Sequence, residues 1–584
     1  MKKMGEILLE NKAISEKDLN KGLNLQKLYR EKIGNILVAE DRIKEEVFLQ
    51  NLAKQQSLKT IIEIENIKFD TSLLREEEIE TYLKLKFLPI RKNNEEVEII
   101  SSDTDKNLED YLALTYKNYT IVLTPFANIL AILEQVFSFI KIQRAINELA
   151  EKIPKNSAKL YLESRYLNKI LLLVCLIFIL GIVSKTALFI ILTLSNLYFF
   201  SVILFKLISF FIGVKEFKKS RSRKIVLPSF DTLPIYSILV PLYKEKEAIV
   251  EGLVMALKRL NYPKTRLDIK LVVEEDDLDT VKLALKFENS YIRVIKTPYS
   301  IPRTKPKAIN YALAFIRGEV VSVFDAEDRP NPNQLLIAVN GLKTASCVQA
   351  ELTISNYKTN LLTRFFKLEY DFLFKFYLRA LEKLGVFIPL GGTSNHIRTK
   401  DLKELYGWDA FNVTEDAELG LRLFEKGKKT SIINSETLED APKTIKNWFN
   451  QRVRWIKGHI KTFLIHSKAS DGFNFAEVFN LWFVLGLSSL IYLITPFVVI
   501  LSVVGFLNND ALPLWLYGFS LFNFCFFVGV NIFIYGAVAI VLKEYRLVLY
   551  SFVIWLYFLL HILASVEAVR ELITKPFFWR KTEH

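Results

Sequence analysis

Two short motifs in the second half of the chain carry side chains that could transfer a sugar from an activated donor. Thr414-Glu415-Asp416 ends in two carboxylates, and Gln451-Arg-Val-Arg-Trp455 begins 35 positions after Asp416. Gln451, Arg454 and Trp455 are spaced i, i+3 and i+4, so they share one face of a helix. Amide and guanidinium groups can hold a diphosphate leaving group, and an indole ring offers a flat surface to a sugar. Taken alone, the pentapeptide is more typical of a half-buried amphipathic helix.

We predict Asp416 to be a general base, because transfer with inversion needs a carboxylate beside the acceptor hydroxyl, opposite the leaving group. Glu415 is predicted to contact the substrate next to it. The alternative is that Thr414 caps a helix that begins near Asp416, which would explain the motif without chemistry. A small polar segment upstream would allow an acceptor sugar close to the backbone; its residues are Gly391, Gly392 and Thr393.

Three carboxylates follow the apolar run Val320–Phe324, at Asp325, Glu327 and Asp328. Hard oxygen ligands at the end of a buried strand suit Mg²⁺ or Mn²⁺ bridging a diphosphate. The alternative is a solvated turn, which acidic residues favour. The motif therefore predicts a divalent metal site.

Two further segments could bind the donor. Glu274, Glu275 and Asp277 follow another apolar run, and a carboxylate there could accept from a uracil N–H or a ribose hydroxyl. Lys307 and Asn310 precede or begin a predicted helix, where a lysine could reach the phosphates. Ordinary charged loops are the alternative for both.

A sheet must position these groups. Apolar runs predict strands at 236–242, 269–273, 291–295 and 320–324, and residues 249–260 predict a helix between the first two. Strands that alternate with helices indicate a doubly wound α/β domain, which we place at 225–472. Ligands of such sheets lie beyond the carboxyl ends of the strands, where both acidic segments fall.

Composition indicates a membrane protein. Of the 584 residues, 51% are hydrophobic and 44 are Phe, and the formal charge is +14. The basic residues cluster beside apolar runs, which favours positive loops at the cytoplasmic face over nucleic-acid binding. The three cysteines have neither disulfide nor metal spacing, so we expect cytosolic soluble parts.

We predict two transmembrane helices within 166–214, after a linker at 146–165, and further transmembrane or interfacial helices within 475–570. The C-terminal candidates are about 484–507, 514–541 and 547–569. Three crossings would put the basic tail 571–584 outside, against the charge rule. One of these stretches is then interfacial or re-entrant, and the sequence leaves the choice open.

Residues 1–57 contain an internal repeat with a shift of 29 residues. Lys3-Met-Gly-Glu-Ile-Leu-Leu9 is echoed by Lys32-Ile-Gly-Asn-Ile-Leu-Val38, and helical apolar spacing continues after each. Each copy is predicted to be a short helix, a turn and a longer helix, with Ser15 as an N-cap. The alternative to ligand binding is a helical docking module. Residues 60–140 are predicted to add a small α+β subdomain.

The combination of an acidic loop, Asp325-Ala-Glu-Asp328, Thr414-Glu415-Asp416 and Gln451–Trp455 resembles the inverting family 2 glycosyltransferases of GT-A fold, close to cellulose and hyaluronan synthases. Thr414–Asp416 and Gln451–Trp455 match in full. Glu327 stands at the second Asp of the DxD metal motif, and Glu274-Glu275 stands where Asp-Asp is usual.

The N-terminal repeat resembles the domain of MshE-type secretion ATPases that binds cyclic di-GMP through two tandem motifs. Lys replaces Arg at the first position of each copy, and Lys12 and Asp41 stand where that motif prefers Gly. The resemblance implies cyclic di-GMP contacts from residues of both copies. These are Lys3, Met4, Gly5, Leu8, Leu9, Leu23, Gln26, Lys32, Ile33, Gly34, Leu37, Val38, Leu52 and Gln55.

Together these resemblances imply a multi-pass enzyme of the inner (cytoplasmic) membrane, with its catalytic and N-terminal domains in the cytoplasm. It would transfer a sugar from a nucleotide-diphosphate donor, such as a UDP-sugar, to an exopolysaccharide under cyclic di-GMP control. The implied partners are the donor, a polysaccharide or lipid-linked acceptor, membrane lipid and an export partner, with no nucleic acid. The alternatives are a non-catalytic receptor or scaffold and a lipid-linked transferase that adds one sugar.

Overall fold

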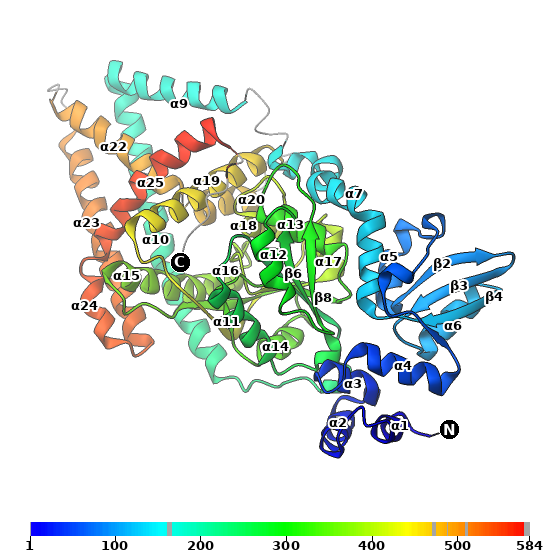
Figure 1. The fold of residues 1–584 in the computed structure, drawn as a ribbon. Helices are drawn as coiled ribbons and strands as arrows, with labels where there is room; N and C mark the ends of the chain where they lie inside the picture. Colours follow the sequence, from blue (N-terminus) through cyan, green and yellow to red (C-terminus); the bar gives the residue numbers. More distant parts are fainter. Residues whose placement is uncertain are drawn as a thin grey trace.

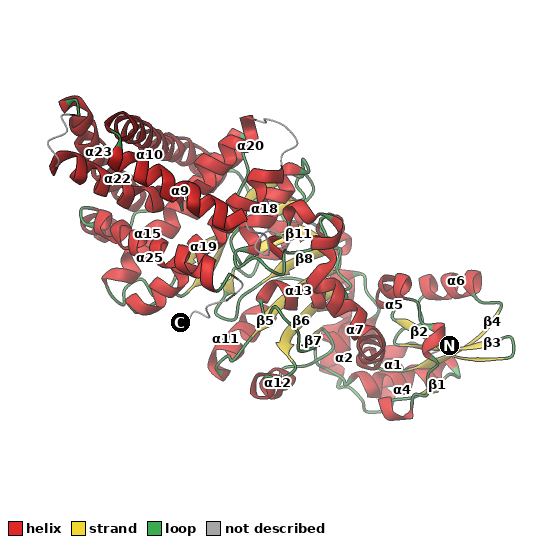
Figure 2. Ribbon diagram, turned by 90° about the horizontal axis from the view of Figure 1, so that it is seen from above, coloured by secondary structure: helices red, strands yellow, loops and turns green. Residues whose placement is uncertain are grey.

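The computed structural model describes residues 2–159, 166–469, 475–486, 489–507, 512–576 and 578. Figures 1 and 2 show an elongated arrangement, with the N-terminal helices at one end, the catalytic sheet in the middle and long apolar helices at the other end. Residues 577 and 579–584, half of the predicted tail, lie outside the described residues.

The predicted N-terminal repeat is present in the structure. The short helices α1 (Met4–Glu10) and α3 (Ile33–Ala39) are each followed by a turn and a longer helix, α2 (Glu16–Tyr29) or α4 (Glu45–Gln56). Ser15 caps α2 by accepting from the Asp18 N–H, as predicted. Lys12 and Asp41 both have a left-handed φ, near +54° and +53°. That conformation explains why glycine would suit this position of each copy.

The glycines of the repeat serve helix packing. A Cβ built on Gly34 would lie 2.1 Å from the ring of Phe48 in α4, and one on Gly5 would lie 2.7 Å from Leu19 in α2. Both contacts are within the same small core. The absence of a side chain therefore brings the helices of each copy together, rather than leaving backbone open to a ligand.

Gly34→Ala is expected to destabilise the N-terminal region by about 1–3 kcal/mol, because the aromatic ring opposite must move to admit a methyl group. Thermal unfolding and limited proteolysis of the full chain measure the change. Lys17→Ala, on the exposed side of α2, is the matched control. Equal stability of the two variants would contradict this packing role.

A four-stranded sheet completes the N-terminal part. Its order is β1-β4-β3-β2, built from Lys59–Thr60, Asn118–Leu123, Glu96–Ser101 and Phe87–Asn93. Helices α5 (Ile79–Leu85) and α6 (Lys106–Thr115) accompany it, and the long helix α7 (Phe126–Lys152) follows. This is the small α+β subdomain that the sequence predicts.

Helix α7 packs against a helix of the large sheet and so connects the N-terminal part to that sheet. It packs on α13 (Lys305–Leu313), and one hydrophobic cluster contains Ile129 and Ile142 of α7 together with Tyr311 and Phe315. Ion pairs Arg266–Glu31 at 2.8 Å and Arg293–Glu45 at 3.1 Å add to the contact. The start of the predicted linker is thus a packed helix, and Ala158 N–H donates to Asp409 at 2.7 Å.

The catalytic part is built on an eight-stranded mixed sheet of order β7-β6-β5-β8-β11-β10-β12-β9. The predicted strands appear as β5 (Tyr236–Leu242), β6 (Leu267–Glu274), β7 (Ile292–Thr297) and β8 (Val320–Val323), all parallel to one another. The predicted helix is α11 (Glu247–Lys258). The remaining strands are β9 (Arg329–Pro330), β10 (Cys347–Ile354), β11 (Asn395–Arg398) and β12 (Thr430–Glu439).

Alternate residues of the parallel strands enter two different cores. Ile238 and Leu271 lie in one cluster with residues of α11, α12 (Leu278–Leu285) and α14 (Gln334–Gly341). Leu239 and Val272 lie in the cluster that contains α13. Since the side chains of a strand alternate between faces, helices cover both sides of the sheet. This confirms the predicted doubly wound α/β fold.

The helices that support the substrate site come from three segments of the chain. Helix α15 (Leu361–Tyr370), the π-helical turn η7 (Asp371–Tyr377) and α16 (Leu378–Leu384) follow β10. Helix α17 (Thr399–Glu404) follows β11, α18 (Glu415–Glu425) precedes β12, and α19 (Ile445–Ala469) follows it.

Two helices of the described part are long and apolar enough to cross a membrane: α10 (Lys185–Ser222) and α23 (Leu514–Val541). A third crossing is counted only if the bent pair Tyr545–Ser551 and Ile554–Thr574 forms one span. Helix α9 (Tyr166–Val183), expected as a span, is not among them, and α22 (Leu490–Leu507) is only a shorter apolar helix. Figure 1 shows α9 across the N-terminal end of α10.

The last helix, α25 (Ile554–Thr574), packs on the catalytic helix α19. Ala564, Ala568 and Leu572 join Val453 and Ile456 in one cluster. The Glu571 carboxylate, at the end of α25, also pairs with Lys457 at 2.9 Å. The predicted span 547–569 is therefore partly covered by the catalytic domain, which favours the interfacial alternative.

Candidate active site

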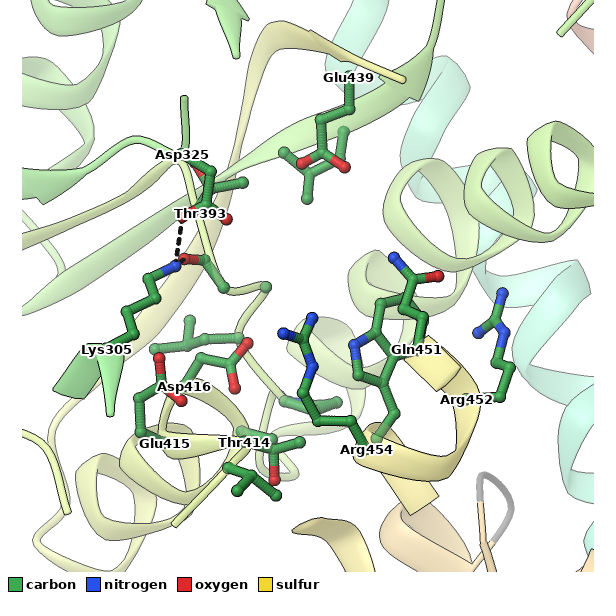
Figure 3. Close-up of a pocket in the computed structure, with 18 of the residues that line it drawn as sticks. Lys305, Asp325, Thr393, Thr414, Glu415, Asp416, Glu439, Gln451, Arg452 and Arg454 are labelled. Atoms are coloured by element: carbon green, nitrogen blue, oxygen red, sulfur yellow. Dashed lines mark hydrogen bonds and ion pairs between the residues drawn. The ribbon is translucent and has the colours of Figure 1, made fainter. Parts of the chain in front are cut away.

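One cavity of about 1070 Å³ collects the candidate catalytic residues. The strand-end loops contribute Asp325 and Glu327, the segment before β11 contributes Gly391 and Gly392, and the start of α18 contributes Glu415 and Asp416. Helix α19 contributes Gln451, Arg454 and Trp455 to the same lining. Figure 3 shows Arg454 directed from α19 toward Asp416, with Gln451 on the same helix. The motifs that the sequence singled out therefore converge.

Asp416 lies in the first turn of α18, facing the glycine segment. A Cβ built on Gly392 would lie 3.2 Å from Asp416 Oδ2, so this glycine makes room for the carboxylate. Thr414 occupies the N-cap position but makes no side-chain capping bond. Its side chain faces Gly458 of α19, where a Cβ would come within 2.3 Å of Thr414 Oγ1. The capping explanation of the Thr-Glu-Asp motif thus accounts for only part of it.

Lys305, at the start of α13, contacts two segments of the site, the loop of Asp325 and the glycine segment. Its Nζ donates to Asp325 Oδ1 at 2.5 Å and to the Gly392 carbonyl at 2.7 Å (Figure 3). Burial opposes the charged lysine, but the carboxylates of Asp325 and Glu415 raise the pKa of Lys305. For Asp416, burial disfavours the charged carboxylate and raises its pKa, whereas the positive charges of Lys305 and Arg454 oppose that rise. Burial and the Asp416 charge raise the pKa of Glu415 to about 7.

We expect the acid limb of the kcat/KM profile to lie above pH 3.8, the ordinary value of an Asp side chain. A general base must be deprotonated, and burial raises the pKa of Asp416, so activity is lost as the pH falls through that raised pKa. A pH–rate profile with saturating metal ion measures the limb. An acid limb at or below pH 3.8 would contradict the assignment.

Four carboxylates gather at the strand ends beside Lys305. Glu327 and Asp325 line the cavity, and Glu439, at the end of β12, faces them. Burial first, and then the charges of Asp328, Glu327 and Asp325, raise the pKa of Glu439. Burial and the charges of Asp325 and Glu327 raise the pKa of Asp328. This mutual repulsion is what a bound cation would relieve.

The donor set fits a divalent cation held partly by its substrate. Oxygen ligands of this kind suit Mg²⁺ or Mn²⁺. In the described part of the chain, however, no three His, Cys, Asp or Glu side chains are gathered closely enough to hold a metal by themselves. Asp325, Glu327 and Glu439 would therefore share the ion with diphosphate oxygens.

Asp328 is absent from the cavity lining, and its role as a metal ligand stays a prediction. Its carboxylate is fully buried, and Oδ2 accepts from the Asp325 N–H at 2.7 Å and from the Thr393 hydroxyl. Because Asp328 is turned inward, it shapes the loop that presents Asp325 and Glu327. Thr393 lines the cavity and also fixes this buried carboxylate.

Four predicted donor contacts lie outside the cavity lining. Lys307 is fully buried and pairs with Glu274 at 2.8 Å. Asn310 donates to the Trp408 carbonyl at 2.7 Å, and Glu275 accepts from the Tyr299 N–H at 2.6 Å. Asp277 caps α12 by accepting from the Thr280 N–H. These side chains stabilise the loops around the site, while Glu274 alone of the acidic segment lines the cavity.

Residues of α19 form the wall opposite the strand ends. The Trp455 ring stacks on Tyr370 of α15, with centroids 6.2 Å apart, and Arg452 covers Trp455 at 4.4 Å. The Gln451 side-chain oxygen is buried and has no hydrogen-bond partner among the described residues. An orphaned amide oxygen on a cavity wall is suited to a ligand hydroxyl.

Sequence reasoning missed Lys305, Glu439, Tyr370 and Arg452. Lys305 lies two residues from the predicted Lys307 in the same segment, and Glu439 ends a strand that its alternating pattern could have located. Tyr370 carries no local signal, because it stacks on Trp455 from another part of the fold. Arg452 lies within the Gln451–Trp455 motif, three residues before Trp455 on the same helix, and that spacing could have identified its contact with the indole ring.

Six of the fourteen candidate cyclic di-GMP residues are buried: Gly5, Leu8, Gly34, Leu37, Val38 and Leu52. Leu8, Leu37, Val38 and Leu52 belong to the hydrophobic core of the repeat, so their side chains are not exposed to a ligand in this structure. Gln26 donates to the Glu31 carbonyl and Gln55 to the Lys2 carbonyl. Lys32 pairs with Asp103 at 2.9 Å. The others are exposed or partly buried: Lys3, Met4, Leu9, Leu23 and Ile33.

Comparison with known proteins agrees with this geometry. The model of the family "Glycosyl transferase family group 2" matches residues 320–567. The probable glycosyltransferase YdaM of Bacillus subtilis is 29% identical over 309 residues, which cover 50% of this chain and 72% of that protein. A β-monoglucosyldiacylglycerol synthase of Trichormus variabilis is 25% identical over 240 residues, 40% of this chain and 50% of that protein. The chain thus spans about half the length of this second relative.

Two solved structures are more distant. A mannosyltransferase from Pyrobaculum calidifontis, in complex with GDP-Man and Mn²⁺, is 15% identical and covers 65% of this chain and 99% of that one, with a TM-score of 0.43. A structure of MshE with cdg is 23% identical and covers 23% of this chain and 99% of that one, with a TM-score of 0.21.

The eight-stranded α/β sheet carries the candidate site at its strand ends. Residues 320–567 match a family 2 glycosyltransferase model, and this part of the chain is a glycosyltransferase domain.

Proposed function

We propose that this protein is a membrane-bound inverting glycosyltransferase that uses a nucleotide-diphosphate sugar. The observation that carries the proposal is the single cavity that joins Asp416 to the Asp325–Glu327 carboxylates and to Gln451, Arg454 and Trp455. A base, a charge-neutralising face for the diphosphate and an aromatic wall for the acceptor are then within one enclosure. Helices α10 and α23 support a location at a membrane.

In the proposed mechanism, Asp416 removes the proton of the acceptor hydroxyl as that oxygen attacks the anomeric carbon from the face opposite the diphosphate. Arg454 and Lys305 stabilise the charge that develops as the bond to the leaving group breaks. A divalent ion at Asp325, Glu327 and Glu439 would supply further stabilisation of the diphosphate. Trp455, held by Tyr370 and Arg452, would orient the acceptor sugar.

The test is a donor screen with the full chain in nanodiscs. We expect one member of a panel of UDP- and GDP-sugars to release its nucleoside diphosphate, with release lost in EDTA and restored by Mg²⁺ or Mn²⁺. No release from any donor with either metal would refute the proposal. It would also favour the scaffold alternative.

For the product, we propose extension of an exopolysaccharide that leaves through an export partner. The basis is the family resemblance of the motifs, and a lipid-linked transferase that adds one sugar is the second candidate. Product length on a gel separates them, because repeated addition yields a ladder and single addition yields one band.

We also propose that cyclic di-GMP binds the N-terminal repeat and stimulates transfer. The supporting features are the two matching copies, the exposed Lys3, and the packing of α7 on α13, which begins with Lys305. A ligand can act in this way only if it prefers one arrangement of the two parts.

Calorimetry of the full chain with cyclic di-GMP tests this regulatory proposal. Lys3→Gln/Lys32→Gln should weaken binding, while the exposed pair Lys17→Gln/Lys21→Gln should not. Glycine variants are unsuitable here because of the packing contacts described above. No heat at high micromolar ligand would reduce the repeat to a docking module.

A further inference from the structure

The catalytic cavity continues between the apolar helices. Beyond Trp455 and Tyr370, its lining passes to Lys206 of α10, Tyr535 of α23 and Phe558 of α25. Tyr492 of α22 and His561 of α25 line the same region. We call this part, formed by Lys206, Tyr377, Tyr492, Tyr535, Phe558 and His561, the inner lobe.

The inner lobe contains a cation in an apolar setting. Lys206 is only 8% exposed, and its ammonium donates to Asn531 Oδ1 at 2.8 Å and to the Tyr535 hydroxyl at 3.1 Å. The rings of Phe372, Tyr535 and Phe558 lie 4.8–5.3 Å from it. Within the described residues, no carboxylate forms an ion pair with Lys206. A charged group in an apolar helix is costly and generally marks a binding or transport function.

The neighbouring carboxylate is committed elsewhere. Glu369 of α15 accepts from Arg452 and from the Tyr557 hydroxyl. A second polar group of the inner lobe has no partner: the Tyr377 hydroxyl is buried and makes no hydrogen bond to any described residue. The cavity is thus lined by a lysine that forms no ion pair and by a hydroxyl without a partner, and both suit an anionic ligand with acceptor oxygens.

The cavity stops inside the helical layer. Among the described residues of α10 and α23, none from 185–205 or 514–534 lines it, and Lys206 and Tyr535 lie toward the end of each helix that meets the catalytic domain. Lys206 is nine residues before Lys215, where the basic flank of α10 begins, or about 13 Å along a helix. A lobe that ends at this depth suits the head group of a lipid better than a polymer that crosses the bilayer.

We propose that the acceptor of this glycosyltransferase is a sugar joined through phosphate to an apolar lipid, and that the inner lobe binds the phosphate at Lys206 and Tyr377. The inference rests on the proposed function, since the acceptor hydroxyl must reach Asp416 while the phosphate lies at Lys206. The anomeric bond of the donor breaks, the acceptor oxygen forms the new bond, and its proton passes to Asp416. The lipid phosphate is bound and takes no part in bond formation.

The test measures binding of farnesyl monophosphate to the full chain in detergent by native mass spectrometry. Farnesol, inorganic phosphate and a glucuronate-containing tetrasaccharide are the comparison probes. We expect farnesyl monophosphate to bind at least about tenfold more tightly than each of them, because the charged phosphate and the apolar chain must both be present.

Lys206→Gln should reduce the advantage over farnesol to about threefold or less, and Tyr377→Phe should reduce it partly. Lys215→Gln, on the exposed side of the same helix, is the matched control and should change nothing. Equal binding of farnesol and farnesyl monophosphate, or an advantage unchanged in Lys206→Gln, would overturn the inference. Tighter binding of the tetrasaccharide would assign the lobe to an acidic glycan instead.

The donor screen on the parent protein tests the glycosyltransferase activity separately from the identity of the acceptor. Metal-dependent release of nucleoside diphosphate, together with failure of the farnesyl phosphate test, would leave the glycosyltransferase in place and remove only the lipid phosphate acceptor. Binding of farnesyl monophosphate with no donor active would leave the phosphate-binding lobe in place and remove the glycosyltransferase, and with it the role of the lipid as an acceptor.

Discussion

Asp416→Asn is expected to lower the rate of sugar transfer by about 10²–10⁴-fold while donor binding stays within about threefold of the parent. The amide keeps the shape of the side chain in the space opposite Gly392 but cannot accept the acceptor proton. Because the base acts in the transition state, kcat carries the loss. Single-turnover transfer and equilibrium binding of the donor measure the two effects.

Asp279→Asn is the control for this variant. Asp279 is an exposed residue in the first turn of α12 and does not line the cavity, so its amide variant should transfer sugar at the parental rate. If Asp416→Asn turned over like this control, Asp416 would not be the base.

Lys305→Met is expected to lower kcat/KM by roughly 100-fold or more. Removing the ammonium leaves Asp325 without the partner that it contacts at 2.5 Å, and this partly buried carboxylate then faces its neighbouring carboxylates without a counter-charge. The carboxylates at the strand ends would then repel the donor diphosphate more strongly. Loss of the bond to the Gly392 carbonyl would also loosen the segment opposite Asp416.

A second readout separates an electrostatic role from a merely structural one. Lys305 lowers the pKa of Asp416, so the variant should move the acid limb of the pH–rate profile to higher pH. Lys343→Met, at an exposed position outside the cavity lining, should leave both the limb and the rate unchanged. An unshifted limb in Lys305→Met, with intact thermal unfolding, would argue against the electrostatic role.

The positions of the first four strands of the large sheet and the N-terminal repeat were accessible from the sequence because both depend on local spacing. The run Tyr236–Leu242 is apolar at every step, and it became a strand with those bounds. The 29-residue shift between Gly5 and Gly34 placed two equivalent helical units. The membrane helices were harder, since apolar length alone does not tell a span from a helix that packs on α19, as α25 does.

The candidate site divides in the same way. Asp416, Gln451, Arg454 and Trp455 were predicted and line the cavity, because helical spacing already fixes which of them share a face. Lys307 was predicted to contact the donor, but Lys305 is the lysine of this segment that lines the cavity. Side chains two positions apart on a helix point about 200° away from each other, so only one of Lys305 and Lys307 can face the site. The packing of α13 on α7 decides which one does.

By itself, the sequence determined the α/β class, the repeat, the motifs and the chemistry that their side chains can perform, because these depend on residue type and short-range periodicity. Only the tertiary structure decided that Asp328 faces inward, that Glu439 joins the carboxylates, and that the cavity reaches Lys206. Each of these depends on contacts between segments that are far apart in the chain, and such contacts are set by the packing of whole elements rather than by local sequence.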